Sequence, residues 1–185
     1  MAISSVIPPG AGAGLHRRLL DAYESTPLAD PAVLTHHALG ADDGERVRRA
    51  AYDAGVMAAR TAAHTQAAEF FTIALDHGGA PTAEEEADLL ELLAWEFYLI
   101  DRLDDAIDAC RRAMRIRQEL GESAAVSADH HSLAVYQWYN ANRGLAETHA
   151  AEAVTVLDAD TEDGDQPVRL GHAFAMRGYL AGRAS

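Results

Sequence analysis

The sequence predicts an all-α fold, a right-handed superhelix of stacked antiparallel helix pairs. A tyrosine followed four positions later by an arginine recurs about every forty residues, and a set of alanines recurs with nearly the same period. Valine and isoleucine show no strict alternation of apolar and polar positions, so no strand is predicted. The repeated residues are Tyr98 and Arg102, Tyr139 and Arg143, Tyr179 and Arg183, and the alanines Ala94, Ala106 and Ala113 matched by Ala134, Ala146 and Ala153.

The N-terminal part of the chain is less regular than the repeats. Residues 1–14 are rich in glycine and proline and are expected to form a flexible leader. A short helix is predicted over 15–25, where leucines recur at helical spacing. Asp30 and Pro31 have the residue types of an N-cap and a first helical residue, so a second short helix is predicted from there to Gly40.

From residue 43 onward the sequence has the pattern of regular helix pairs, which glycines and a proline separate. Residues 15–185 are therefore expected to form a single repeat domain. Its last helix has no partner before the sequence ends, so we expect the chain to be a fragment of a longer protein. The predicted helices are about 43–60, 64–77, 83–99, 103–120, 124–141, 145–158 and 167–181, in units 43–79, 83–121, 124–158 and an incomplete unit 167–185.

Charge and composition exclude several classes of function. The net charge of −14 argues against direct binding of nucleic acid or of anionic membrane surfaces, because both depend on basic side chains. All basic residues are arginine, so a Schiff-base lysine and the lysine of a phosphate-binding loop are both absent. Cys110 is the single cysteine and is expected to be a small buried thiol. With no apolar stretch long enough to span a bilayer and no signal peptide, a cytoplasmic location is expected.

The spacing of the small residues resembles that of tetratricopeptide repeats. In that family small side chains occupy three fixed positions of each unit, and both alanine sets keep the internal spacing of those positions. Gly55, Ala67 and Ala74 fit as a third set. The chain departs from the family in a longer period and in lacking the usual proline near the end of each unit.

A narrower resemblance covers nearly the whole chain. Segments such as LHRRLLDAYE and LLELLAWEFYLIDRLDDAIDACRRAMRIRQELGE are similar to the helical arm of LuxR-type, MalT-like ATP-binding transcriptional regulators. In those proteins a nucleotide-binding module precedes the arm and a helix-turn-helix follows it. Neither module is present here, so the resemblance implies a non-catalytic sensor or scaffold without a cofactor.

The same resemblance suggests where a ligand would bind. In tetratricopeptide-like stacks the first helix of each unit lines a concave groove, which here would take a peptide, a protein segment or a small effector. The alternative for each residue is packing between helices, since aromatic residues at helical spacing are more often core. The matching positions are Glu91, Trp95, Tyr98, His131, Val135, Trp138, His172, Met176 and Tyr179. The arginines Arg102, Arg143 and Arg183 are expected at turns, bonding helix-end carbonyls or acids of the neighbouring unit.

Other patterns are weaker. The residues Asp129 to Ser132 have the types of a hydrolytic triad, but neighbours on a helix point about 100° apart and cannot form a relay. No two histidines have the spacing that places them on one helical face, so no metal site is predicted, although ligands from different helices remain possible. The acidic segment 158–165 lacks the glycine and glutamate of a calcium loop.

Two alternatives to a binding module remain open. One is self-association, for instance as a homodimer, through the unpaired helix 167–181, which would expose Leu170, Phe174 and Tyr179. The other is a metal-dependent enzyme that uses clustered histidines.

Overall fold

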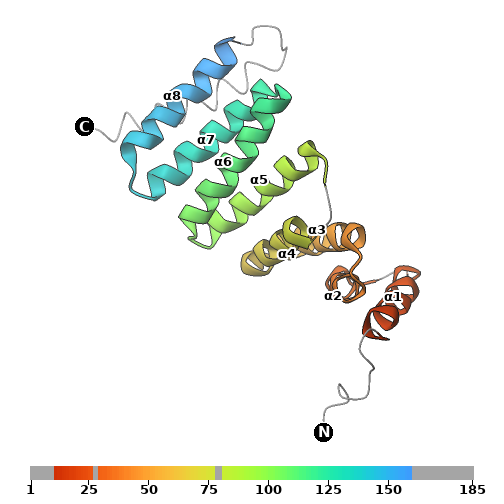
Figure 1. Cartoon of the computed structure of the whole chain (residues 1–185). Coiled ribbons are helices and arrows are strands. Elements are labelled where there is room, and N and C mark those ends of the chain that lie inside the picture. The colour runs from red at the N-terminus through yellow and green to blue at the C-terminus, as the bar shows by residue number, and fades with distance from the viewer. Residues whose placement is uncertain (1–10, 27–28, 78–80, 160–185) are drawn as a thin grey trace. The chain divides into compact units, whose positions relative to one another are not determined.

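The structure is a computed structural model that describes residues 11–26, 29–77 and 81–159 (Figure 1). Within these residues every regular element is an α-helix, and consecutive helices pack against each other from α1 to α4 and from α5 to α8. The all-α prediction is therefore confirmed. The helices are α1 (Ala11–Glu24), α2 (Pro31–Ala41), α3 (Gly44–Arg60), α4 (His64–His77), α5 (Ala83–Leu99), α6 (Leu103–Leu120), α7 (Ser123–Tyr139) and α8 (Arg143–Ala159).

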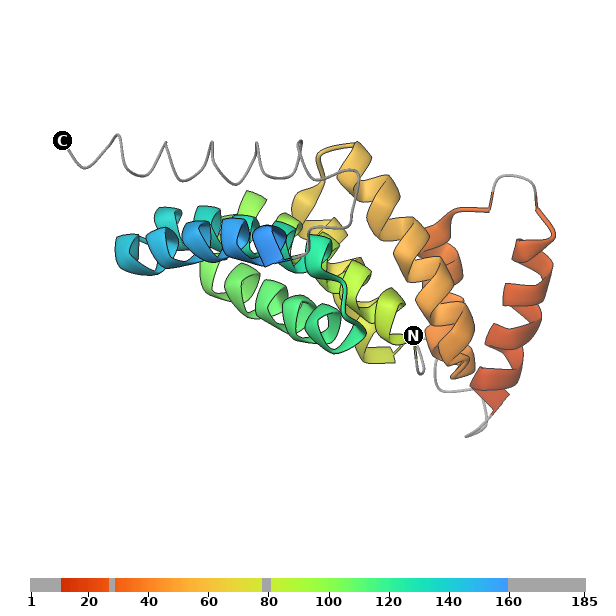
Figure 2. The ribbon, with the colours of Figure 1, turned by 90° about the horizontal axis from the view of Figure 1, so that it is seen from above.

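The contacts divide the chain into two compact units. The first unit ends at Pro81 and holds α1 to α4, and the second begins at Thr82 and holds α5 to α8. In the second unit the four helices follow one another side by side in chain order (Figures 1 and 2). The predicted final helix, 167–181, lies outside the described residues.

Local capping signals explain why the helix boundaries were predictable. Asp30 accepts a hydrogen bond from the Ala32 amide at 2.9 Å and begins α2. Thr82 and Glu85 form a reciprocal capping box at the start of α5. Gly121 ends α6 with φ of 76°, a left-handed conformation that favours glycine.

The first helix begins earlier than expected. It starts at Ala11, so residues 11–14 belong to α1 and not to a leader. Each glycine in a helix costs about 1 kcal/mol relative to alanine, and this penalty led us to expect a flexible segment. Ala11 and Ala13 are strong helix formers, and the following turns pack on α2, which offsets that cost.

A repeated turn joins the two helices of a pair. Its middle residue has a positive φ (58° at Ala62, 62° at Asp101 and 58° at Ala141). The amide of the next residue then donates to the carbonyl five positions earlier, as from Arg102 to Phe97 at 2.9 Å. Asp101 and Ala141 are forty positions apart, as the alanines are, whereas Tyr98 and Tyr139 are forty-one apart. The tyrosine and arginine element is thus shifted by one residue between the two pairs.

The repeated small residues are the close-packing positions of the stack. Their side chains are at most 1% exposed, and such small groups let helices approach closely. Gly55 shows the constraint most directly, because a Cβ there would lie 2.5 Å from Cε1 of Phe71. The buried alanines are Ala67, Ala74, Ala94, Ala106, Ala113, Ala134, Ala146 and Ala153.

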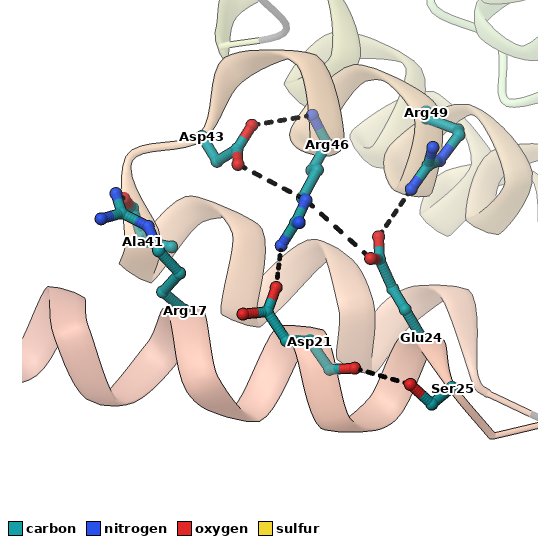
Figure 3. A network of polar contacts seen from close by, with 8 residues as sticks. All are labelled: Arg17, Asp21, Glu24, Ser25, Ala41, Asp43, Arg46 and Arg49. Carbon is teal, nitrogen blue, oxygen red and sulfur yellow. Dashed lines mark hydrogen bonds and ion pairs between the residues drawn. The ribbon is translucent and has the colours of Figure 1, made fainter.

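Ion pairs attach α1 to the start of α3 (Figure 3). Arg46 donates to Asp21 at 2.6 Å, and Arg49 donates to Glu24 at the same distance. From the middle of α1, Arg17 donates to the carbonyl of Ala41, the last residue of α2, at 3.2 Å. These contacts, together with the core of Leu20, Ala38 and Val47, fix how α1 sits on α2 and α3.

Candidate functional site

Exposed aromatic side chains meet on α5 and α7 in the second unit. The rings of Trp95 and Tyr98 lie 5.5 Å apart, and Tyr98 also lies 5.5 Å from Tyr139 of α7. Trp95 is 50% exposed and Tyr139 61% exposed, although both are large aromatics. The ring of Tyr136, which is buried, lies 5.2 Å from the ring of Tyr98. We call Trp95, Tyr98 and Tyr139 the aromatic row.

The structure brings only some of the predicted groove residues to this row. Trp95 and Tyr98 belong to it, and Glu91 lies exposed on the same helix. Trp138 packs against the buried alanines between α7 and α8, as the packing alternative expected. His131 and Val135 are half-buried on α7. His172, Met176 and Tyr179 lie outside the described residues. Tyr139 was recognised only as a repeat position and not as a site residue.

A buried arginine organises the carboxylates beside the row. Arg117 of α6 is 5% exposed, and its guanidinium donates to Asp129 of α7 at 2.8 Å. The same group donates to Glu91 at 2.5 Å and to Asp88 at 3.1 Å, both on α5. One positive charge therefore holds three carboxylates from two helices, and the cluster keeps a net negative charge. No local sequence pattern predicts this cluster, because its members come from three helices.

Asp129 is the most buried acid of this cluster. Burial raises the pKa of Asp129 to about 7, the charge of Glu91 adds to the increase, and Arg117 opposes it. Among the described residues its Oδ2 atom has no hydrogen-bond partner, which also disfavours the charged form. By contrast the pKa of Arg117 is raised by its carboxylate partners, although its burial opposes this.

The high pKa of Asp129 predicts that the second unit loses stability as pH rises. An unfolded aspartate has a pKa of about 3.9, so below that pH both states are protonated and the folded state bears no cost. Between about pH 4 and pH 7 the unfolded state ionises first, and the free energy of unfolding should fall by up to about 1.4 kcal/mol per pH unit. Asp129→Asn should flatten this dependence, measured by urea unfolding from pH 4.5 to 7.5. Asp108→Asn, at an exposed site on α6, should leave the dependence unchanged.

Asp129 and His130, two residues of the triad pattern, interact with different partners. Asp129 pairs with Arg117, whereas Nδ1 of His130 lies 3.0 Å from Nδ1 of His149 on α8. Burial lowers the pKa of both His130 and His149, that of His149 to about 4. Cys110 is buried as predicted, and burial raises the pKa of its thiol. The sequence-adjacent groups therefore form no relay, as helical geometry required.

The turn arginines pair with acids nearer in the sequence than expected. The side chain of Arg102 donates to Asp105 at 2.8 Å, and that of Arg143 donates to Glu147 at 2.8 Å. Asp105 lies in α6 and Glu147 in α8, so neither acid comes from a neighbouring unit. A spacing of three or four residues on a helix already places each acid within reach of its arginine. Arg102 also lies over the ring of Phe97, 4.3 Å from its centroid. Arg183 lies outside the described residues.

A pocket of about 280 Å³ lies elsewhere on the second unit. It is lined by α6 and by the turn between α7 and α8, including Asp104, Asp108 and Arg111, and shares no residue with the predicted groove. Its lining mixes polar and apolar side chains, and its volume lies just below the usual range of pockets for drug-sized ligands.

Three histidines of the first unit converge, which the sequence did not predict. His16 on α1 meets His36 and His37 on α2. Burial, and the positive charge that His36 and His16 can carry, lower the pKa of His37. Histidine spacing along the sequence indicates only ligands within one helix, so it does not predict a cluster that joins two helices.

The described helices include none that is both long enough and apolar enough to cross a membrane. No protein-family model and no curated protein sequence matches the chain. The helix arrangement is similar to the crystal structure of BtubC (BKLC) from P. vanneervenii, with a TM-score of 0.53 and 19% identity over 92% of this chain and 69% of that one. It is also similar to the crystal structure of the MamA protein, with a TM-score of 0.51 and 12% identity over 94% of this chain and 88% of that one. The fold is tetratricopeptide-like.

Proposed function

We propose that this chain is a non-catalytic interaction scaffold that binds an extended peptide or protein segment over the aromatic row. The observation that carries the proposal is the exposure of Trp95 and Tyr139 beside Tyr98 on adjacent helices. Burial of a large aromatic side chain in an interface is strongly favourable. Tryptophan and tyrosine are enriched among the residues that contribute most of the binding energy in protein interfaces. The half-exposed indole is therefore the expected anchor.

The charge around the row indicates what kind of partner would fit. Glu91 and Asp88 precede Trp95 on α5 by about one and two helical turns, expose more than half of their side chains and share a single arginine. The whole chain carries a net charge of −14, which speeds association with basic partners. A segment with arginine or lysine next to apolar side chains would satisfy both features. The pocket of about 280 Å³ gives less support to a small effector, because its volume is small for a ligand site.

Removal of Trp95 should abolish most of the binding without affecting the fold. Peptides selected from a random display library on the full chain supply the probe, and basic, apolar sequences are expected among them. Trp95→Ala should weaken their binding by about tenfold or more, measured by fluorescence anisotropy of the labelled peptide. Leu145→Ala, at an exposed apolar residue of α8 outside the row, is the matched control.

Far-UV circular dichroism should show unchanged helicity in both variants, since both side chains are exposed. Equal affinity of the wild type and Trp95→Ala for every selected peptide would contradict the proposed site.

The resemblance of the sequence to the helical arm of LuxR-type regulators supports a narrower proposal, that this scaffold is the sensor part of such a protein. Many helical-repeat proteins share the fold, so the fold does not discriminate among them. The gene sequence on either side of the chain tests this: a phosphate-binding loop upstream and a helix-turn-helix downstream are expected, and their absence would reject it. Self-association through 167–181 rests on residues outside the described part.

A further inference from the structure

Three imidazole rings from two helices gather on one side of the first unit. The ligand nitrogens of His16, His36 and His37 all lie within 4.8 Å of one another. The ring centroids are 5.4 Å apart for His16 and His36, and 5.2 Å apart for the other two pairs. Three neutral imidazoles within such distances are the donor set of many zinc sites.

The contact between His16 and His37 has the separation of two metal ligands. Their Nδ1 atoms lie 3.0 Å apart. Two nitrogens bound to one tetrahedral zinc ion, each at about 2.05 Å, lie about 3.3 Å apart. Without an ion, only one proton can lie between these nitrogens, so one ring must donate and the other accept. An ion bound to both lone pairs would replace that single hydrogen bond.

A glycine creates the space that this arrangement needs. A Cβ on Gly40 would lie 2.5 Å from Cγ and from Nδ1 of His16, too close for either ring atom. Gly40 lies within α2, where alanine would be about 1 kcal/mol more favourable for the helix. Glycine at this position allows the ring of His16 to lie against the backbone of α2, three to four residues after His36 and His37.

Contacts outside the cluster hold α1 in this position. Arg17, next to His16, donates to the carbonyl of Ala41, next to Gly40. Further along α1, Asp21 and Glu24 pair with arginines of α3 (Figure 3). His16 and His37 are half-buried and thus restricted, whereas His36 is exposed and can rotate its ring to approach the other two. Its exposure also leaves a fourth position open to water.

We propose that His16, His36 and His37 bind one divalent transition-metal ion of the zinc type, which joins α1 to α2. Imidazole nitrogens select zinc, copper and nickel ions over calcium or magnesium, which prefer oxygen. The site is independent of the aromatic row, because it lies in the first unit and the row lies in the second. Its role is structural: the ion binds the folded state and thereby stabilises the packing of α1.

Calorimetric titration with Zn²⁺ tests the proposal on the full chain, prepared without a histidine tag. The wild type should bind one more ion than His36→Ala, or bind it at least about tenfold more tightly, since even indirect disturbance of a metal site costs 10–100-fold. His36 is exposed, so its replacement should not disturb the fold. His77→Ala, at an exposed histidine at the end of α4, should bind like the wild type. Comparing stoichiometries separates this site from the His130 and His149 pair of the second unit.

Gly40→Ala provides a test that keeps all three ligands. The new methyl group should displace the ring of His16 and weaken Zn²⁺ binding by about tenfold or more. Tetrahedral Co²⁺, bound in place of Zn²⁺, should give an intense visible absorption in the wild type that His16→Ala lacks. Equal Zn²⁺ affinity and stoichiometry in the wild type and His36→Ala would overturn the proposal, as would a Co²⁺ spectrum that His16→Ala leaves unchanged.

Discussion

Arg117→Met should destabilise the second unit by about 3–5 kcal/mol at pH 8, the usual cost of removing one partner from a buried ion pair. Arg117 is 5% exposed and is the shared counterion of Asp129, Glu91 and Asp88. Without it, the 2% exposed carboxylate of Asp129 must either stay charged in an apolar environment or take up a proton. Methionine preserves much of the volume of the arginine stem, so the loss is chiefly that of the charge.

The stability lost in Arg117→Met should depend on pH. At pH 5 Asp129 is protonated in both proteins, because its pKa is about 7 in the wild type and higher still without Arg117. Above pH 7 the wild type no longer loses stability through this group. The variant continues to lose it, because its folded state still holds the proton that the unfolded state has released. The difference between the two proteins should therefore be smaller at pH 5 than at pH 8.

Tryptophan fluorescence during urea unfolding tests this prediction, because it reports selectively on the second unit. The only two tryptophans of the chain, Trp95 and Trp138, are both in the second unit. Arg112→Met is the matched control: Arg112 lies on the same helix and pairs with Glu86 at 3.3 Å, but its side chain is 52% exposed. Its replacement should cost less than about 1 kcal/mol, since solvent screens such pairs. Similar losses for the two variants would contradict the structural role of Arg117.

Phe71→Ala should destabilise the first unit by about 3–5 kcal/mol, because it removes the largest fully buried side chain and leaves a cavity. Phe71 lies against Gly55 of the neighbouring helix α3, which it approaches too closely for any Cβ. Gly55→Ala should accordingly cost about 1–3 kcal/mol through overpacking. The gain of about 1 kcal/mol that alanine brings to a helix interior reduces the expected net loss to at most about 2 kcal/mol.

The two substitutions should not be additive. In the double variant the new methyl group enters the space that the phenyl ring has left, so the combined loss should be smaller than the sum by about 0.5–3 kcal/mol. Far-UV circular dichroism is the suitable probe, since the first unit holds no tryptophan. Gly144→Ala on α8, where an added Cβ meets no atom within 4 Å, should stabilise its helix slightly. An additive double variant would show that Gly55 is not constrained by Phe71.

Helix positions could be predicted because the signals that set them are local. The Asp30 cap, the Thr82 capping box and the left-handed Gly121 each act within a few residues. The small residues were equally informative, since only alanine or glycine fits where two helices approach closely. From residue 43 to 159 these signals placed every helix end within two positions of the structure.

The start of α1 and the register of the tyrosine and arginine element were less predictable. Glycine at positions 12 and 14 suggested a leader, yet both lie in the helix. The tyrosines recur in the sequence but shift by one position against the turns, so Tyr98 corresponds to Trp138 and not to Tyr139. That shift buries one side of Trp138 against α8 and exposes Tyr139 beside Tyr98. The alanine period of forty already matches Tyr98 to Trp138, but it does not show which of the neighbouring residues Trp138 and Tyr139 packs against α8 and which is exposed.

Capping, helix propensity and the spacing of small residues are properties of neighbouring positions, and they determined the all-α class and the helix limits from the sequence. The juxtaposition of side chains from different helices depended on tertiary packing. The core of Leu20, Ala38 and Val47 sets the rotation of α1 about its axis, and with it whether His16 faces His37. Arg117 likewise meets Asp129 and Glu91 only because α6 packs against both α5 and α7. Both clusters join residues more than ten positions apart, whose separation is fixed by packing between helices and not by the geometry of any one helix.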